Sequence, residues 1–289
     1  MKRLVVHIGT HKTGTSSFQR YCFKFKELLD KKGVCYPSIK GYEWMNNHSV
    51  LAWALDKSSE EQALIMLNDI FLQFKEEKHH TLLISSEDFE NSLLGSDQLD
   101  RLIRSAKNQN FNSFEILVVT RDPLDYLSSI YTELSKQSIV LNFSQIAEAA
   151  LSYGYFSAST PHFNYNFAIN AKHFIGKLSK EYPNASIKHY DLSTFVANFP
   201  GQSYLAQIAG EEAVQIMESI GLQKQFNNRK ANPLQAEINY VQNMLNGFEC
   251  IAQDEVKRRE LIILLAKERL ALVEASKKEI AAKLRTSNR

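Results

Sequence analysis

A short segment near the N-terminus holds the residues best suited to binding an anion. The apolar residues 4–8 are followed by Gly9, Lys12 and Gly14, and then by residues that favour a helix. Glycine adopts backbone conformations closed to other residues, so the amides between Gly9 and Gly14 can converge on one anion. The positive end of the following helix and the Lys12 cation would attract the same anion. The segment therefore predicts a strand, a phosphate-binding loop and a helix.

The position of the lysine separates this loop from that of the nucleoside triphosphatases. In those proteins the Lys directly follows the last glycine, and the next Ser or Thr binds magnesium. Here Lys12 precedes Gly14 by two residues. A P-loop kinase or nucleotide hydrolase is the main alternative on the same architecture. The strand predicted at 81–87, however, ends in Ser-Ser-Glu and not in the Asp that would help to hold magnesium.

A second motif places an arginine at the end of a buried strand. The apolar residues 116–119 predict a parallel strand, and Arg121 follows at its carboxyl end. Asp122 is a favourable helix N-cap, and Pro123 suits the first helical position. Arginine forms bidentate, charge-assisted hydrogen bonds with phosphate. Arg121 is therefore a candidate phosphate ligand, the alternative being an ion pair with Asp122 or Asp125.

In this order along the chain, the two motifs resemble the sulfotransferases that use 3′-phosphoadenosine 5′-phosphosulfate (PAPS) as donor. The segment Lys12-Thr13-Gly14-Thr15-Ser16 is similar to the loop that holds the 5′-phosphosulfate, and Arg121 and Ser129 have the spacing of the pair that binds the 3′-phosphate. The resemblance implies an α/β fold of the P-loop type, in which a parallel sheet carries helices on both faces, and no metal. It also implies that the donor is bound by His11, Lys12, Thr13, Gly14, Thr15, Ser16, Arg121 and Ser129.

A later basic segment offers a less complete match to the same family. Arg229, between Asn228 and Lys230, resembles the basic segment that many sulfotransferases fold over the nucleotide. The eukaryotic soluble enzymes carry Gly-rich flanks and a Trp there, and this sequence carries neither. The resemblance alone therefore makes Arg229 an expected nucleotide contact.

Two residues are expected to carry the transfer of the sulfuryl group. Lys12 would stabilise the charge on the leaving phosphate, while a base takes the proton of the acceptor. Sulfotransferases place a His or a Glu at the end of the corresponding strand, and Ser85-Ser86-Glu87 resembles bacterial and Golgi-type members. Glu87 is therefore the expected base, although it could instead neutralise Lys12 or Arg121. His48 is the second candidate, because it lies in a polar segment between a strand and a helix, where acceptor contacts are common.

The expected acceptor is a hydroxyl or amine of a carbohydrate or glycolipid. The short Lys-Thr-Gly-Thr loop and the Ser-Ser-Glu strand look closer to carbohydrate sulfotransferases than to the soluble phenol and steroid enzymes. The aromatic segment 153–165 suits a sugar or phenolic acceptor, and packing onto the core explains the same residues equally well. A non-catalytic protein that binds adenosine bisphosphate and interacts through its C-terminal helices is a further alternative.

The elements that position these residues predict one α/β core and a helical extension. Strand and helix signals alternate over residues 1–210, which favours a parallel sheet flanked by helices and makes this the PAPS-binding core. Residues 211–289 carry only helical signals, and they are expected to pack on the core or to form a homodimer. In this extension, residues 254–289 hold ten Lys and Arg against six Asp and Glu, so contact with an anionic membrane surface is an alternative. Helices are expected at 16–32 and 168–181, and irregular structure at 152–167.

The composition fits a cytoplasmic enzyme. The 289 residues are 44% apolar, enough for a full core. The net charge of +2 is too small to argue for nucleic acid as a partner. We expect no signal peptide and no transmembrane helix, because no apolar run is long enough. The three cysteines are scattered without metal-binding spacing, so they are expected to be reduced thiols.

Overall fold

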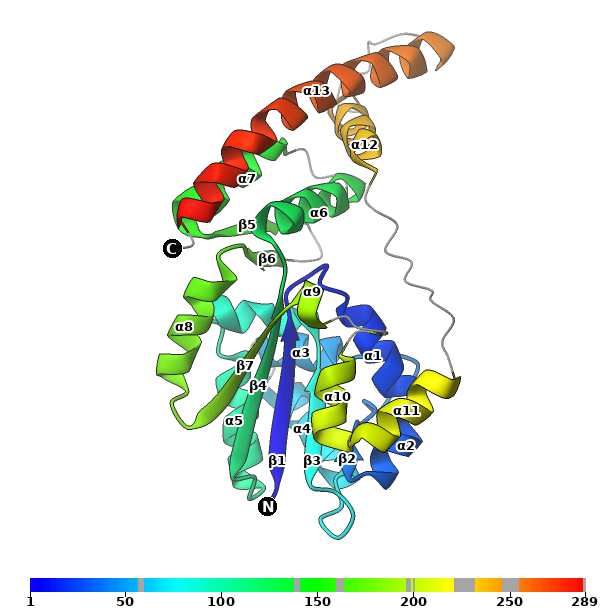
Figure 1. The fold of residues 1–289 in the computed structure, drawn as a ribbon, viewed down its shortest axis with the longest axis vertical. Helices are drawn as coiled ribbons and strands as arrows, with labels where there is room; N and C mark the ends of the chain where they lie inside the picture. The colour runs from blue at the N-terminus through cyan, green and yellow to red at the C-terminus, as the bar shows by residue number, and fades with distance from the viewer. Residues whose placement is uncertain are drawn as a thin grey trace. The chain divides into compact units, whose positions relative to one another are not determined.

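A parallel five-stranded sheet forms the centre of the fold. The computed structural model describes residues 1–56, 60–137, 141–159, 164–195, 199, 201–220, 232–245 and 255–287. The strand order in the sheet is β2-β3-β1-β4-β7. The bounds are β1 Arg3–Gly9, β2 Val34–Cys35, β3 Thr81–Ser85, β4 Ser113–Thr120 and β7 Ala185–Asp191. The predicted α/β fold, with a parallel sheet flanked by helices and a helical C-terminus, is confirmed (Figure 1).

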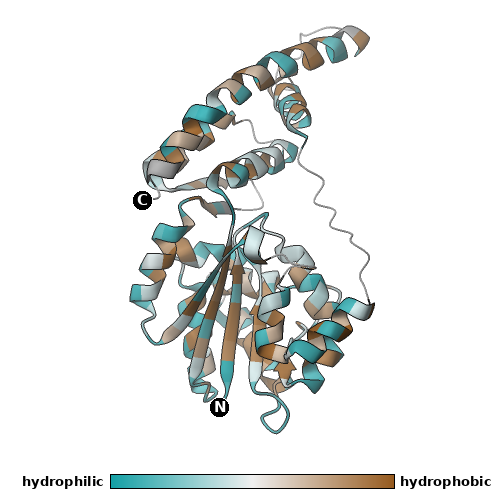
Figure 2. Ribbon diagram, in the orientation of Figure 1, coloured by the Kyte–Doolittle hydropathy of each residue, from teal (hydrophilic) through white to brown (hydrophobic). Residues whose placement is uncertain are grey.

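The central strands are apolar because the sheet is covered on both faces. Residues Leu4 to Ile8 of β1 and Ile116 to Val119 of β4 are almost fully buried, as expected for parallel strands between helical layers. Figure 2 shows hydrophobic residues along these strands and mixed colouring on the helices. The helices therefore present one apolar side to the sheet and one polar side to solvent.

Helices on the two faces of the sheet come from different parts of the chain. One face packs against α1 (Thr15–Lys24), α2 (Lys26–Lys31), α10 (Gln202–Ala209) and α11 (Glu211–Ile220), with Val5, Leu117 and Phe18 in the shared core. Figure 1 shows α3 (Ser49–Asp56), α4 (Glu60–Gln73) and α5 (Gln98–Asn108) on the other face. The remaining short elements are η1 (Glu87–Leu94), α8 (Ala171–Glu181) and α9 (Leu192–Phe195).

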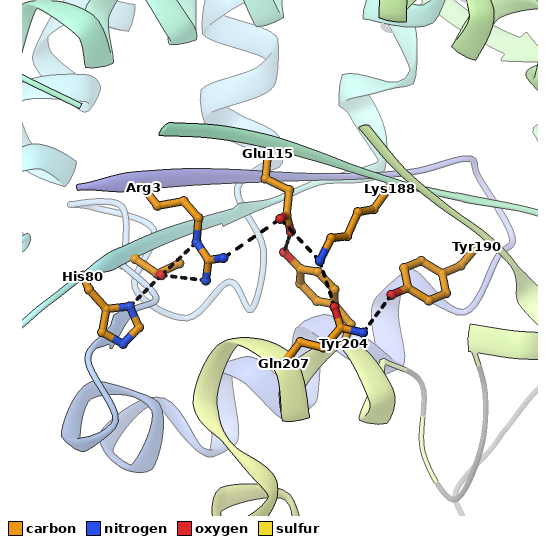
Figure 3. Close-up of polar contacts among 8 residues, drawn as sticks. Arg3, His80, Glu115, Lys188, Tyr190, Tyr204 and Gln207 are labelled. Atoms are coloured by element: carbon orange, nitrogen blue, oxygen red, sulfur yellow. Dashed lines mark hydrogen bonds and ion pairs between the residues drawn. The ribbon is translucent and has the colours of Figure 1, made fainter. Parts of the chain in front are cut away.

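A buried charge network joins α10 to three strands of the sheet (Figure 3). Glu115 of β4 is 5% exposed and accepts a hydrogen bond from the hydroxyl of Tyr204 on α10. Its Oε2 lies 3.5 Å from Lys188 Nζ of β7 and 4.0 Å from Arg3 Nη1 of β1. Burial raises the pKa of Tyr204 above its ordinary value. Because both cations compensate the buried carboxylate, this network holds α10 on the sheet near the amino ends of the strands.

A second group of elements has a core of its own. It contains α6 (Pro123–Lys136), α7 (Phe143–Tyr153), α12 (Pro233–Leu245), α13 (Glu255–Ser287) and the hairpin β5 (Tyr155–Ser159) to β6 (Asn164–Ala168). Glu237 of α12 is 1% exposed; its carboxylate accepts from Tyr131 Oη of α6 at 2.8 Å and from Arg269 Nε of α13 at 2.9 Å. These two hydrogen bonds to Glu237 connect the three helices.

The structure divides the chain into two units. Their boundaries differ from the division between residues 210 and 211 that the sequence predicted. One unit holds Met1–Arg121 and Phe174–Phe226, and the other holds Asp122–His173 and Asn227–Arg289. The reason is that α12 and α13 pack on α6 and α7, and Ile280 and Leu284 of α13 share a core with Phe143 of α7. Each unit therefore contains two separate stretches of sequence.

Three local features differ from the sequence-based expectation. The helix expected at 16–32 is broken into α1 and α2 at Phe25, whose φ of −102° and ψ of 23° are not helical. The segment 152–167, expected to be irregular, contains β5 and most of β6. The helix expected from residue 168 begins at Ala171. Among the described residues, no helix combines the length and the apolar character needed to cross a membrane.

Candidate functional site

Three groups predicted to act together lie at one edge of the sheet. The strands β3, β1 and β4 are neighbours and parallel, so the residues that follow them meet at the carboxyl edge. The phosphate loop follows β1, Glu87 follows β3, and Arg121 follows β4. Arg121 Nη1 donates to the carbonyl oxygen of Lys12 at 3.5 Å. Glu87 contacts Thr15, the first residue of α1.

The loop between β1 and α1 is held in a tight turn by its own hydrogen bonds. Lys12 has a φ of 63° and Gly14 a φ of 73°, so two residues of the loop are left-handed. Thr13 Oγ1 donates to Thr10 O at 2.5 Å, and Thr10 N donates to Val119 O of β4 at 3.0 Å. A left-handed conformation is uncommon for lysine, and such conformations cluster at functional sites.

The start of α1 has the properties of an anion-binding site. The N-cap Gly14 has no side chain, and no side-chain hydrogen bond caps the helix. The first amides of a helix have no partner within the helix and favour a negative charge. Lys12 and Ser16 are exposed beside these amides. The residues present therefore suit an anionic group such as a phosphate.

Gly9 allows α1 to begin close to the end of β1. A Cβ atom on Gly9 would lie 1.7 Å from Thr15 Cγ2 and 3.2 Å from Thr13 Oγ1. No side chain fits in that space unless the side chain of Thr15 is displaced. The glycine seen in the sequence is therefore required by a close approach between strand and helix.

Glu87 places a carboxylate directly against the loop. Its Oε2 accepts a hydrogen bond from Thr15 Oγ1 at 2.5 Å, and its Oε1 lies 3.9 Å from His11 Nδ1. The Ser86 hydroxyl accepts from Asp88 N at 3.0 Å and starts the helical turn that carries Glu87. The Glu87 side chain is 27% exposed. The carboxylate is therefore fixed at the loop and still open to a reactant, as a general base must be.

A neighbouring carboxylate, Glu90, also contacts the loop and was not expected from the sequence. Glu90 is fully buried, and its Oε2 accepts a hydrogen bond from the backbone N–H of His11 at 2.9 Å. It lies three residues after Glu87, so both carboxylates project from one side of η1. That spacing is the signal that could have identified Glu90, had the segment after β3 been interpreted as helical.

His48 lies in the interior and not in a solvent-facing loop. It is 1% exposed, its Nδ1 accepts from Ser85 N at 3.0 Å, and its Nε2 lies 3.0 Å from Pro37 O. These partners place the ring proton on Nε2. Burial lowers the pKa of His48 from 6.5 to about 4. Because both nitrogens are bonded to backbone, this geometry argues against His48 as the base.

The remaining expected site residues belong to the second unit or lie outside the described residues. Ser129 is half-buried on α6, in the second unit. Arg229 lies outside the described residues. In the aromatic segment, Tyr153 is 70% and Tyr155 40% exposed, whereas Phe156 is buried in the core of the second unit. The segment thus supplies both surface and core residues.

Comparison with known proteins adds little to this description. No protein-family model matches the sequence, and no curated protein matches it significantly. Among solved structures, a chain from the PezAT chromosomal toxin–antitoxin system of the human pathogen Streptococcus pneumoniae is 13% identical, with a TM-score of 0.33. The match covers 76% of this chain and 85% of that chain. A likeness of this size carries no information about fold or function.

Proposed function

We propose that this protein is a PAPS-dependent sulfotransferase that sulfates a hydroxyl or amine of a carbohydrate or glycolipid. The observation that supports it most is the contact of Glu87 with Thr15, at the start of the helix that the phosphate loop opens. Arg121 reaches the same loop through Lys12 O. An anion site, a second cation and an accessible carboxylate are thereby combined, as sulfuryl transfer to a hydroxyl requires.

Each residue has a distinct role in the proposed reaction. PAPS supplies the sulfuryl group and leaves as adenosine 3′,5′-bisphosphate. Glu87 takes the proton of the acceptor hydroxyl while the bond between oxygen and sulfur forms. Lys12 stabilises the negative charge on the phosphate oxygens while the bond from phosphate to sulfur breaks. Arg121 binds the 3′-phosphate.

A P-loop kinase or hydrolase remains the second candidate, because the parallel sheet would serve it equally. Lys12 lies before Gly14, in the left-handed turn, and β3 continues into Ser86 and Glu87. Neither feature matches the lysine and the magnesium-binding Asp of that class. ATP turnover that requires magnesium would favour this candidate over the sulfotransferase.

A binding experiment tests the proposal directly. Calorimetry with adenosine 3′,5′-bisphosphate in the presence of a chelator should show binding without added metal. Incubation with labelled PAPS and a glycan extract should then transfer the label to a product that is heavier by one sulfuryl group. Failure to bind either nucleotide would end the proposal.

Cytoplasmic location and the role of α13 are further parts of the proposal. The scattered cysteines support a reducing compartment, and Cys22 and Cys35 are buried free thiols. The basic composition of α13 supports contact with an anionic surface, and contact with a second copy of the chain is the alternative. Gel filtration and sedimentation with anionic vesicles would separate these two roles.

A further inference from the structure

An exposed tryptophan lies in the loop that ends at His48. This loop, residues 37–48, follows β2 and is called the Trp44 loop below. The side chains of Trp44 and Tyr42 are 78% and 38% exposed. Because β2 is the neighbour of β3 in the parallel sheet, its loop lies at the same carboxyl edge as the Glu87 segment.

Hydrogen bonds within the Trp44 loop order the backbone that carries these aromatic side chains. Tyr42 N donates to Ile39 O at 2.9 Å, and Met45 N donates to Tyr42 O at 2.9 Å. Gly41 N donates to Glu43 Oε1 at 3.0 Å. Because the backbone of the loop is already ordered, a ligand that contacts these exposed side chains does not have to order the loop.

The two ends of the Trp44 loop are fastened to the residues that carry Glu87. The ring of His48 links Pro37 O, at the start of the loop, to Ser85 N, at the end of β3. His48 N also donates to Ser85 O at 2.9 Å. One residue further on, Ser49 Oγ and Ser86 Oγ are 3.0 Å apart. The loop and the Glu87 carboxylate are therefore attached to one rigid support.

The chemistry of the loop fits a sugar ring. A pyranose has an apolar face of C–H groups, which stacks on indole, and a polar rim, which needs hydrogen-bonding partners. Lys40 and Glu43 are exposed and Asn46 is half-exposed, so polar groups flank Trp44. A small phenol would need an enclosed apolar pocket to lose most of its hydration, whereas an open aromatic side chain suits one unit of a longer glycan.

We infer that the Trp44 loop binds the carbohydrate acceptor by stacking Trp44 on a sugar ring beside Glu87. This inference rests on the proposed sulfotransferase function. It assigns the recognition of the acceptor to β2 and its loop. The histidine that the sequence suggested as a base, His48, becomes a positioning residue that holds the loop and the Glu87 segment in register.

Fluorescence of Trp44 provides a direct test. The chain contains two tryptophans, and Trp53→Phe leaves Trp44 as the only one. This variant is titrated with three probes: a tetrasaccharide of N-acetylglucosamine, a tetrasaccharide of glucose, and an unsulfated tetrasaccharide of alternating hexuronate and hexosamine. We expect at least one probe to change the Trp44 emission saturably. In calorimetry with that probe, Trp44→Ala should weaken binding about tenfold or more, and Trp44→Phe about threefold, as for an aromatic hot spot.

Two controls separate this inference from the proposed function. Leu72→Ala removes another exposed apolar side chain of the same unit, 79% exposed, and should leave glycan binding unchanged. Each variant is also titrated with adenosine 3′,5′-bisphosphate, which should bind with unchanged affinity. Nucleotide binding without a response of Trp44 to any tetrasaccharide, or a saturable response to phenol alone, would overturn the inference and leave the sulfotransferase proposal standing. Glycan binding without nucleotide binding would support the Trp44 loop as a glycan site and contradict the sulfotransferase proposal.

Discussion

At the scale of single residues, the carboxyl edge of the sheet combines a carboxylate and two cations with different tasks. Glu87 is held by Thr15 on the loop side, and its neighbour Asp88 turns back to the Ser86 hydroxyl. Two adjacent carboxylates thus have different surroundings. Only Glu87 contacts the first residue of α1, so only Glu87 is expected to act on an acceptor bound there.

Replacement of Glu87 by Gln should stop catalysis and preserve binding. Gln keeps the shape of the side chain and still accepts a hydrogen bond from Thr15, but it does not take a proton. Turnover should fall by roughly 10²–10⁴, the contribution of a general base, while the affinity for adenosine 3′,5′-bisphosphate stays within about threefold. Stopped assays with labelled PAPS measure the rate. Asp88→Asn is the matched control, and near-normal turnover of Glu87→Gln would remove Glu87 from the mechanism.

Arg121 should distinguish nucleotides by their 3′-phosphate. Arg121→Ala should weaken the binding of adenosine 3′,5′-bisphosphate by about 1.5–3 kcal/mol, the cost of losing a hydrogen bond to a charged group. The binding of adenosine 5′-monophosphate should be weakened much less, because this nucleotide has no 3′-phosphate. Calorimetry of both ligands gives the difference. Equal losses would show that Arg121 acts through its bond to Lys12 O and shapes the loop instead.

At the scale of elements, the junction of β1 and α1 depends on a contact with no spare room. The Cβ of an alanine at position 9 would overlap Thr15 Cγ2. Gly9→Ala should therefore destabilise the protein by about 1–3 kcal/mol, the usual cost of overpacking. Urea unfolding measures the change. The double variant Gly9→Ala, Thr15→Ser should recover part of it, since serine lacks Cγ2 and retains the hydroxyl that bonds to Glu87. If the double variant lost the sum of the stabilities lost by the two single variants, this explanation would be contradicted.

At the scale of the whole molecule, two buried histidines tie stability to pH. Burial lowers the pKa of His7 from 6.5 to about 3 and that of His48 from 6.5 to about 4. Both are neutral in the folded state, while the unfolded chain binds a proton at each below about pH 6.5. Their contribution is therefore complete above that pH and is lost as the pH falls towards 4 and 3.

This linkage predicts the size of the acid destabilisation. At pH 5 each histidine should lower the free energy of unfolding by about 2 kcal/mol relative to neutral pH, from 1.36 kcal/mol for each pKa unit. Urea unfolding at pH 7.5 and pH 5 measures the drop. In His48→Gln the decrease in the free energy of unfolding between pH 7.5 and pH 5 should be smaller by the contribution of one histidine. This holds whatever the stability of the variant at pH 7.5. An unchanged drop would mean that His48 is already protonated in the folded state at pH 5.

The sequence by itself determined the three central strands of the sheet, the loop after β1 and the order of the candidate site residues along the chain, because these depend on local signals. Apolar runs before Gly9 and Arg121 specify buried parallel strands, and Pro123 after Asp122 specifies the start of a helix. Even the pairing of Glu87 with the loop follows from parallel strands that end at one edge.

Only the tertiary structure decided which residues support the site and how the chain divides. The burial of His48 depends on residues far apart in sequence, and no local pattern reports it. The spacing of Glu90 from Glu87 is a local signal, but only the fold shows that Glu90 contacts the loop. The helical signals of residues 211–289 predict helices that pack, but only the fold shows that the partners of α13 are α6, α7 and α12. The physical reason is that local propensity and periodicity act within a few residues, whereas burial and hydrogen-bond partners are set by whichever elements the folded chain brings together.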